Sequence, residues 1–93
     1  MGRTMGAKLE RDNVRIGERV RFAREMEGLS QTALAGSVRL SQQMVSKIES
    51  GQCAVLAVHL YRIAAATGRN VSWFFDPLPA TDRPARRRDT VAV

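Results

Sequence analysis

The sequence predicts a single all-α domain with a flexible segment at each end. Three observations indicate this: the chain has 93 residues, apolar side chains recur at helical spacing through residues 13–75, and all three prolines follow residue 76. Residues 1–12 are polar and show no periodicity, which predicts a flexible arm. Residues 76–93 combine the prolines with three consecutive arginines, which predicts a flexible tail. The folded domain is then residues 13–75.

Five helices are expected within the domain, and most are bounded by residues that commonly start or stop a helix. Asn13, Ser30 and Ser41 precede three of them, and a glycine follows three. A last short turn ends before Pro77, because proline cannot continue a helix. The expected helices are residues 13–27, 31–38, 42–50, 55–67 and 72–75.

Apolar residues at helical spacing mark the side chains that we expect in the core. Ala35 is expected where two short helices cross, because a short side chain lets helices approach closely. The expected core residues are Ile16, Val20, Ala23, Leu34, Ala35, Val38, Leu40, Val45, Ile48, Leu56, Leu60, Ile63 and Ala64.

Composition excludes several classes of protein. The net charge of +6 favours a polyanionic partner such as nucleic acid. No run approaches the roughly 18 apolar residues of a membrane span, so we expect a cytoplasmic protein without a membrane partner. A single cysteine (Cys53) and a single histidine (His59) cannot form a disulfide or bind zinc, so no metal and no cofactor are expected. Without a phosphate loop or paired carboxylates, the chain is not expected to be an enzyme.

The most informative feature is the pair of short helices at residues 31–38 and 42–50. Their tight connection forces a steep crossing and a shared core. Glutamine can pair with adenine in the DNA major groove, and helix N-termini attract phosphate. The alternative is a solvated surface that is merely polar. The side chains left outward on the second helix are Gln42, Gln43, Ser46 and Lys47.

The residues of this segment also follow a known order and spacing. They are Gly28-Leu29-Ser30-Gln31-x-x-Leu34-Ala35 and Leu40-Ser41-Gln42-Gln43-x-Val45-Ser46-Lys47-Ile48-Glu49-Ser50-Gly51. This order resembles the helix-turn-helix of the Cro/phage-repressor (XRE) family. The resemblance implies a compact five-helix, lambda-repressor-like domain of bacteria or their phages, with the motif at residues 31–50. Such a domain is usually dimeric and binds double-stranded operator DNA.

The resemblance implies a role for each residue of the motif. The base-reading residues would be Gln42, Gln43, Ser46 and Lys47, and the phosphate contacts would be Gln31, Ser41 and Gln52. Gln31 would also brace Gln42. Arg24 and Glu49 would form an ion pair that orients the second helix of the motif. Losing one partner of a buried pair costs about 3–5 kcal/mol, whereas an exposed pair contributes under about 1 kcal/mol.

Three residues or segments depart from the family pattern. Arg39 stands where the family usually has glycine; either the turn differs, or a strain of about 1 kcal/mol is tolerated because the arginine reaches phosphate. Residues 53–56 supply no evident cap for the fourth helix. Phe22 falls on the outward side of the first helix, where it either covers the core edge or contacts a partner.

Three consecutive aromatic residues, Trp73, Phe74 and Phe75, follow the fourth helix. One short turn cannot bury all three against one domain, which predicts a homodimer interface. A two-fold dimer would place two recognition helices about 34 Å apart, in successive major grooves. The alternative is that all three side chains fold back over the core.

Together these features predict a sequence-specific transcriptional regulator. We expect a repressor that binds a palindromic operator as a homodimer and occupies a promoter, with residues 42–50 in the major groove. The alternative is an antitoxin of a toxin–antitoxin pair, which binds a partner protein that the sequence does not identify and autoregulates its operon.

Overall fold

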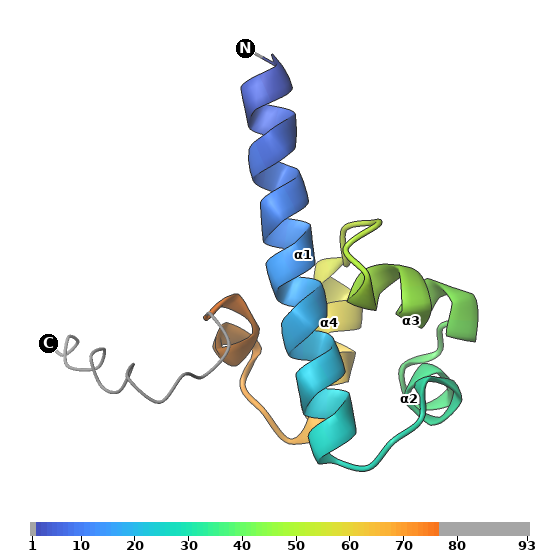
Figure 1. Ribbon diagram of the computed structural model, residues 1–93. Helices are drawn as coiled ribbons and strands as arrows, with labels where there is room; N and C mark the ends of the chain where they lie inside the picture. Colours follow the sequence, from blue (N-terminus) through green and yellow to red (C-terminus); the bar gives the residue numbers. More distant parts are fainter. Residues whose placement is uncertain (1, 77–93) are drawn as a thin grey trace, which may run out of the picture.

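The computed structural model describes the backbone of residues 2–76 and the side chains of residues 9–76. This part of the chain contains four α-helices, one 3₁₀ helix and no strand. Figure 1 shows α1 as the long axis, with α2 and α3 on one side and η1 on the other. The elements are α1 (Gly2–Met26), α2 (Gln31–Val38), α3 (Gln42–Glu49), α4 (Ala57–Thr67) and η1 (Val71–Phe75).

The last element is a 3₁₀ helix, which corrects the expectation of five α-helices. The all-α class is confirmed, but Val71–Phe75 forms only a short 3₁₀ turn. Asp76 has extended backbone angles, φ −84° and ψ 153°. Pro77 follows it, and the residue before a proline is driven out of the α region, so the segment stops before it can form an α-helix.

The first helix is longer than expected. α1 begins at Gly2, so the prediction of a helix start at Asn13 is wrong, and residues 2–12 of the expected arm are helical. No proline interrupts this segment, and adding residues to an anchored helix costs little. Figure 1 shows it projecting beyond the other helices. The division into arm, domain and tail stays a prediction, and tail residues 77–93 lie outside the described part.

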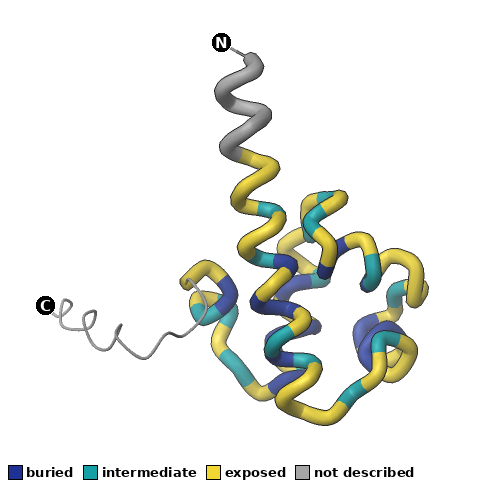
Figure 2. The backbone as a smooth tube through the Cα atoms, viewed as in Figure 1, coloured by how far each residue is buried: buried dark blue, intermediate teal, exposed yellow. Residues whose placement is uncertain are grey.

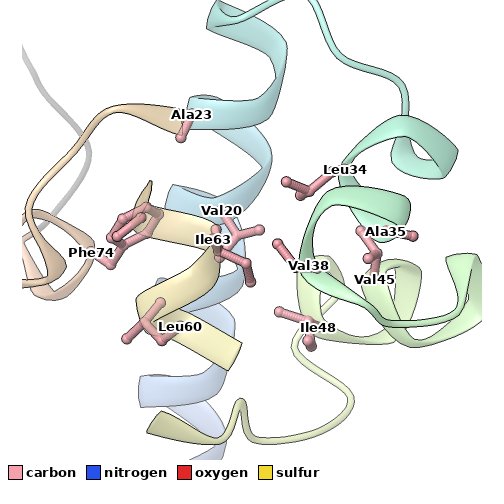
Figure 3. Packing of buried hydrophobic residues seen from close by; sticks show 11 residues of the cluster. Val20, Ala23, Leu34, Ala35, Val38, Val45, Ile48, Leu60, Ile63 and Phe74 are labelled. Atoms are coloured by element: carbon pink, nitrogen blue, oxygen red, sulfur yellow. The ribbon is translucent and has the colours of Figure 1, made fainter. Parts of the chain in front are cut away.

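The core lies where α1, α2, α3, α4 and η1 converge (Figures 2 and 3). Nearly all the predicted core residues lie in it or pack against it, but Leu56 is 62% exposed. Leu56 precedes the first turn of α4 instead of lying within it, and its side chain therefore misses the core. The buried apolar residues are Val20, Ala23, Leu34, Ala35, Val38, Val45, Ile48, Leu60, Ile63, Ala64 and Phe74.

Two glycines let α1 pack closely against the end of α3. A Cβ on Gly17 would collide with the backbone carbonyl oxygen of Ile48. Gly51 has a φ of +78°, and a Cβ there would lie 2.6 Å from Cγ2 of Val14. Because neither position has room for a side chain, this contact fixes how α3 sits on the domain.

A buried arginine fastens η1 to α1. Arg19 donates hydrogen bonds from Nε and Nη2 to the carbonyl oxygen of Trp73, at 3.0 and 2.8 Å. Its guanidinium lies 3.5 Å from the centre of the Trp73 ring, and burial lowers the pKa of this group. Phe22 stacks on the same ring with centroids 6.1 Å apart. Phe22 is half-buried and contacts Trp73, which itself packs against the core.

Membrane-spanning and metal-binding features are absent from the described residues. No helix there combines the length and apolar character needed to cross a bilayer. In the same part of the chain, no three side chains among His, Cys, Asp and Glu are grouped to hold a metal ion.

Candidate nucleic-acid interface

Both helices of the predicted motif begin at a serine cap, as expected. The Ser30 hydroxyl accepts a hydrogen bond from the backbone N–H of Ala33 at 3.0 Å. The Ser41 hydroxyl accepts from the N–H of Met44, also at 3.0 Å. A side-chain cap pairs one of the four N–H groups that a helix start leaves open, and the remaining N–H groups keep their positive field.

The turn between α2 and α3 has a left-handed backbone at Arg39. The φ of 63° and ψ of 43° make it the one non-glycine residue with positive φ in the described part of the chain. Its N–H donates to the carbonyl oxygen of Ala35, which closes the end of α2. The arginine therefore accepts a strain of roughly 1 kcal/mol, and its side chain is exposed.

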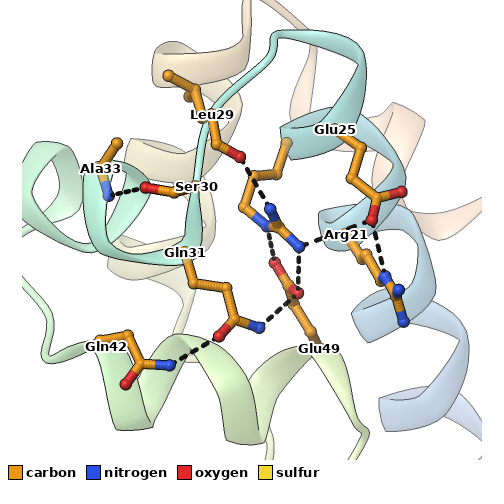
Figure 4. Close-up of polar contacts among 9 residues, drawn as sticks. Arg21, Glu25, Leu29, Ser30, Gln31, Ala33, Gln42 and Glu49 are labelled. Carbon is orange, nitrogen blue, oxygen red and sulfur yellow. Dashed lines mark hydrogen bonds and ion pairs between the residues drawn. The ribbon is translucent and has the colours of Figure 1, made fainter.

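A chain of polar contacts runs from α1 to the N-terminal end of α3 (Figure 4). Arg24 donates from Nε to Oε2 of Glu49 at 2.6 Å and from Nη2 to Oε1 at 3.1 Å. Nε2 of Gln31 donates to the same Oε1 at 2.9 Å. Nε2 of Gln42 then donates to Oε1 of Gln31 at 2.7 Å. This relay, Arg24–Glu49–Gln31–Gln42, connects the expected ion pair to a candidate base-reading side chain.

The ion pair at the root of the relay is buried. The Glu49 side chain is 4% exposed and the Arg24 side chain 12%. The hydrogen bonds that Arg24 donates to Glu49 raise the pKa of its guanidinium, so the arginine stays charged. Nη1 of Arg24 also donates to the carbonyl oxygen of Leu29 at 2.8 Å. Removing Glu49 would leave this cation only the Leu29 oxygen and the exposed carboxylate of Glu25, which lies 3.8 Å from Nη2, whereas removing Arg24 would leave the buried Glu49 carboxylate without a cation.

The outward face of α3 gathers the predicted base-reading residues. Gln42, Gln43 and Lys47 are exposed and Ser46 is half-buried, while the core residues of α3 point the other way. Arg39 precedes this face and exposed Gln52 follows it in the loop after α3. Glu49 is the sole acidic residue of α2 and α3, and it is buried. The two helices therefore expose no negative charge that would repel phosphate.

The aromatic residues of η1 divide into three environments. Phe74 has no exposed surface and belongs to the core, so the expectation that it lies in a dimer interface is wrong for this structure. Trp73 is half-buried under Arg19, and a second arginine, Arg69, lies 4.8 Å from its ring centre. Phe75 is 52% exposed. The 3₁₀ geometry turns successive side chains to different sides, which is why the three separate.

Sequence reasoning missed Gly17 and the two acceptors that hold Arg19 and Arg24. The carbonyl oxygens of Trp73 and Leu29 carry no residue-type signal, because every residue has such an oxygen. The apolar spacing of α1 gave one clue: Arg19 lies beside Val20 and one turn before Ala23, on the buried side.

A family model described as helix-turn-helix matches residues 20–74, more than half of the chain. The chain belongs to the helix-turn-helix family. Its motif is of the Cro/phage-repressor (XRE) type, as the order of residues in α2 and α3 predicted.

Two relatives from this family show the extent of the match. A regulator of Sinorhizobium fredii, the HTH-type transcriptional regulator y4aM, is 33% identical over 73 residues, covering 78% of this chain and 51% of the relative. A transcriptional regulator in the ATPase CF(0) region of Rhodospirillum rubrum is 36% identical over 67 residues, covering 72% and 62%. The chain thus spans about half of the first relative's length and under two thirds of the second's.

Two solved structures share the fold. The restriction-modification controller protein C.AhdI of Aeromonas hydrophila is 34% identical with a TM-score of 0.66, covering 69% of this chain and 97% of that one. PlcR of Bacillus thuringiensis, solved with the peptide PapR7 and DNA, is 29% identical with a TM-score of 0.64. That match covers 74% of this chain and 24% of PlcR.

Proposed function

We propose that this helix-turn-helix protein is a sequence-specific DNA-binding transcriptional regulator that inserts α3 into the major groove. The observation that carries the proposal is the relay that holds Gln42 at the start of α3, on a face without exposed acidic residues. A helix with positioned amides at its N-terminal end suits base-edge recognition in the wide groove. The names of the Sinorhizobium and Rhodospirillum relatives support the same function.

The two glutamines of the face are assigned different tasks. Gln42 gives one hydrogen of Nε2 to Gln31, which fixes the amide and leaves Oε1 as an acceptor for the exocyclic amine of adenine or cytosine. Gln43 is exposed, and no side-chain hydrogen bond ties it to the rest of the described chain. Gln43 is therefore available for a bidentate contact with adenine N6 and N7. Ser46 and Lys47 complete the base-proximal set.

Phosphate contacts are assigned to the edges of the face. Gln31 and Ser41 stand at the starts of α2 and α3, where unpaired backbone N–H groups also attract anions. Arg39 and Gln52 are exposed on either side of α3 and can reach the two phosphate backbones that border the groove.

The functional unit of the proposal is a homodimer on a palindromic operator, acting as a repressor by occupying a promoter. Exposed Phe75 lines a shallow groove of about 280 Å³ with Asp12, Arg15 and Ile16. The groove carries both an acid and a base, so two copies related by a two-fold axis can pair opposite charges around a shared apolar centre. The antitoxin alternative has no support in the names of the relatives.

The test selects bound sequences from a random duplex pool and then measures affinity for the selected site. Gln43→Ala is expected to weaken specific binding by about 1–3 kcal/mol while sparing binding to unrelated DNA. Asn70→Ala, which changes an exposed residue just before η1, serves as the control and is expected to have no effect. Recovery of an inverted repeat would support the dimer. An equal loss on random DNA would contradict base reading by Gln43.

A further inference from the structure

The outward side of α4 is apolar, although it faces solvent. The residues at its exposed positions include Val58, Tyr61 and Ala65, with Leu56 just before the helix. Tyr61 is 66% exposed. The opposite side of α4 is buried in the core, so this helix is apolar nearly all round. A helix of that kind is normally covered on both sides, and a surface helix normally presents polar residues to water.

A shallow, open groove beside this face offers a partner helix a surface to lie on. It has a volume of about 410 Å³ and lies between α4, α2 and the loop before α2. Small side chains on one wall, Ala65 and Ala66, let a partner backbone approach closely. The remaining lining residues are Leu29, Ser37, Tyr61 and Arg62.

The charge of the groove identifies the chemistry of its occupant. Arg62 is the one formal charge of α2 and α4 at neutral pH, and neither helix contains an acidic residue. A second copy of this face would supply no acidic residue from α2 or α4 to pair with Arg62. The groove at Phe75 differs, because Asp12 and Arg15 supply both signs there. The α4 face therefore suits a different molecule that carries negative charge.

We propose that the groove between α2 and α4 binds an acidic amphipathic helix of another protein. The apolar stripe of that helix packs on Tyr61, Ala65 and Ala66, and a carboxylate pairs with Arg62. No residue of α3 lines the groove, so the partner and DNA use different sides of the molecule. The inference does not depend on DNA recognition, because none of the residues assigned to DNA lines this groove.

The experiment measures binding of two matched synthetic helical peptides to the full chain by fluorescence anisotropy. Both peptides have a leucine stripe; one has glutamate beside the stripe and the other has lysine. The glutamate peptide is expected to bind at least about tenfold more tightly, and Arg62→Glu is expected to reverse that preference. Lys47→Glu makes the same charge change on exposed α3 and is expected to leave the preference intact.

Three outcomes would overturn the proposal. The first is equal binding of the two peptides to the unmodified chain. The second is a reversal of preference by Lys47→Glu as large as that by Arg62→Glu, which would place the peptide on α3. The third is a change of oligomeric state in sedimentation of Tyr61→Ser, because the face would then be covered by a second copy. Since Tyr61 is exposed, this variant is expected to remain folded.

Discussion

α3 and α4 follow each other in the chain but present opposite kinds of surface to solvent. α3 exposes Gln42, Gln43 and Lys47 and buries only its inner side. α4 buries one side in the same core but exposes Val58 and Tyr61 on the other. The difference extends to their starts: α3 has a side-chain cap, whereas α4 begins without one.

The two helices are also held in place by different forces. The hydrogen bonds between Arg24 of α1 and Glu49 set the orientation of α3. Close packing at Gly17 sets the distance between α3 and α1. α4 is held by the burial of Leu60, Ile63 and Ala64. Substitutions at Glu49 or Gly17 should therefore alter both stability and DNA affinity. Substitutions at the exposed surface of α4 should not change DNA affinity.

The largest expected effect comes from Glu49→Ala, which removes the root of the relay. The variant leaves the buried Arg24 cation and the Gln31 amide without their acceptor, so the free energy of unfolding should fall by about 3–5 kcal/mol in urea titration. Glu27→Ala is the control, because the Arg69–Glu27 pair lies outside the relay at the surface and should contribute under about 1 kcal/mol. Losses of equal size in the two variants would contradict the separate role of the buried pair.

Two glycine substitutions test the packing behind α3. Gly17→Ala places a Cβ against the backbone of Ile48 and should lower the free energy of unfolding by about 1–3 kcal/mol. Gly36→Ala, within α2, meets no atom within 4 Å and should raise it by roughly 0.5–1 kcal/mol. Urea titration of both variants measures the two effects. Stabilisation by Gly17→Ala would show that α1 does not fix α3 through this contact.

Arg39→Gly separates backbone strain from charge at the turn before α3. Glycine adopts the left-handed conformation without strain, so the free energy of unfolding, measured by thermal denaturation, should rise by roughly 1 kcal/mol. The same variant should reduce the salt dependence of DNA binding by about one phosphate contact. An unchanged salt dependence would remove Arg39 from the interface, and an unchanged stability would show that the turn relaxes around arginine.

The smallest expected effect comes from giving α4 a side-chain cap of the kind that α3 has. Leu56→Ser offers a hydroxyl at the position that lacks a side-chain cap, and should stabilise the domain by about 0.5–1 kcal/mol in thermal unfolding. DNA affinity should not change, because Leu56 lies outside the α3 face. A loss of stability would instead mean that the exposed leucine packs on its neighbours.

Local signals were sufficient to predict α2 and α3. Ser30 and Ser41 act through hydrogen bonds to a backbone N–H three residues away, so the sequence alone locates them. The expected Arg24–Glu49 partnership came from family resemblance and is present. The contacts of Gln42, Gln43, Ser46 and Lys47 with DNA stay predictions.

Features that depend on the whole fold were not predictable in the same way. The Arg19–Trp73 contact joins residues 54 positions apart, and its acceptor is a backbone oxygen. The start of α1 was misplaced because Asn13 favours a helix cap, and this local preference is outweighed in a helix that continues through it. Leu56 was assigned to the core because helical spacing was extended beyond the true first turn of α4. These three misses concern an element boundary or a distant partner.

Leu29 belongs to both surfaces of this molecule. Its carbonyl oxygen accepts a hydrogen bond from Arg24, and the residue lines the groove between α2 and α4. Its own N–H donates to the carbonyl oxygen of Arg24 at 3.1 Å. One residue thus contacts Arg24, which supports α3, and also lines the groove between α2 and α4. In a nitrogen-15 labelled sample, its amide resonance is a natural reporter for occupancy of either side.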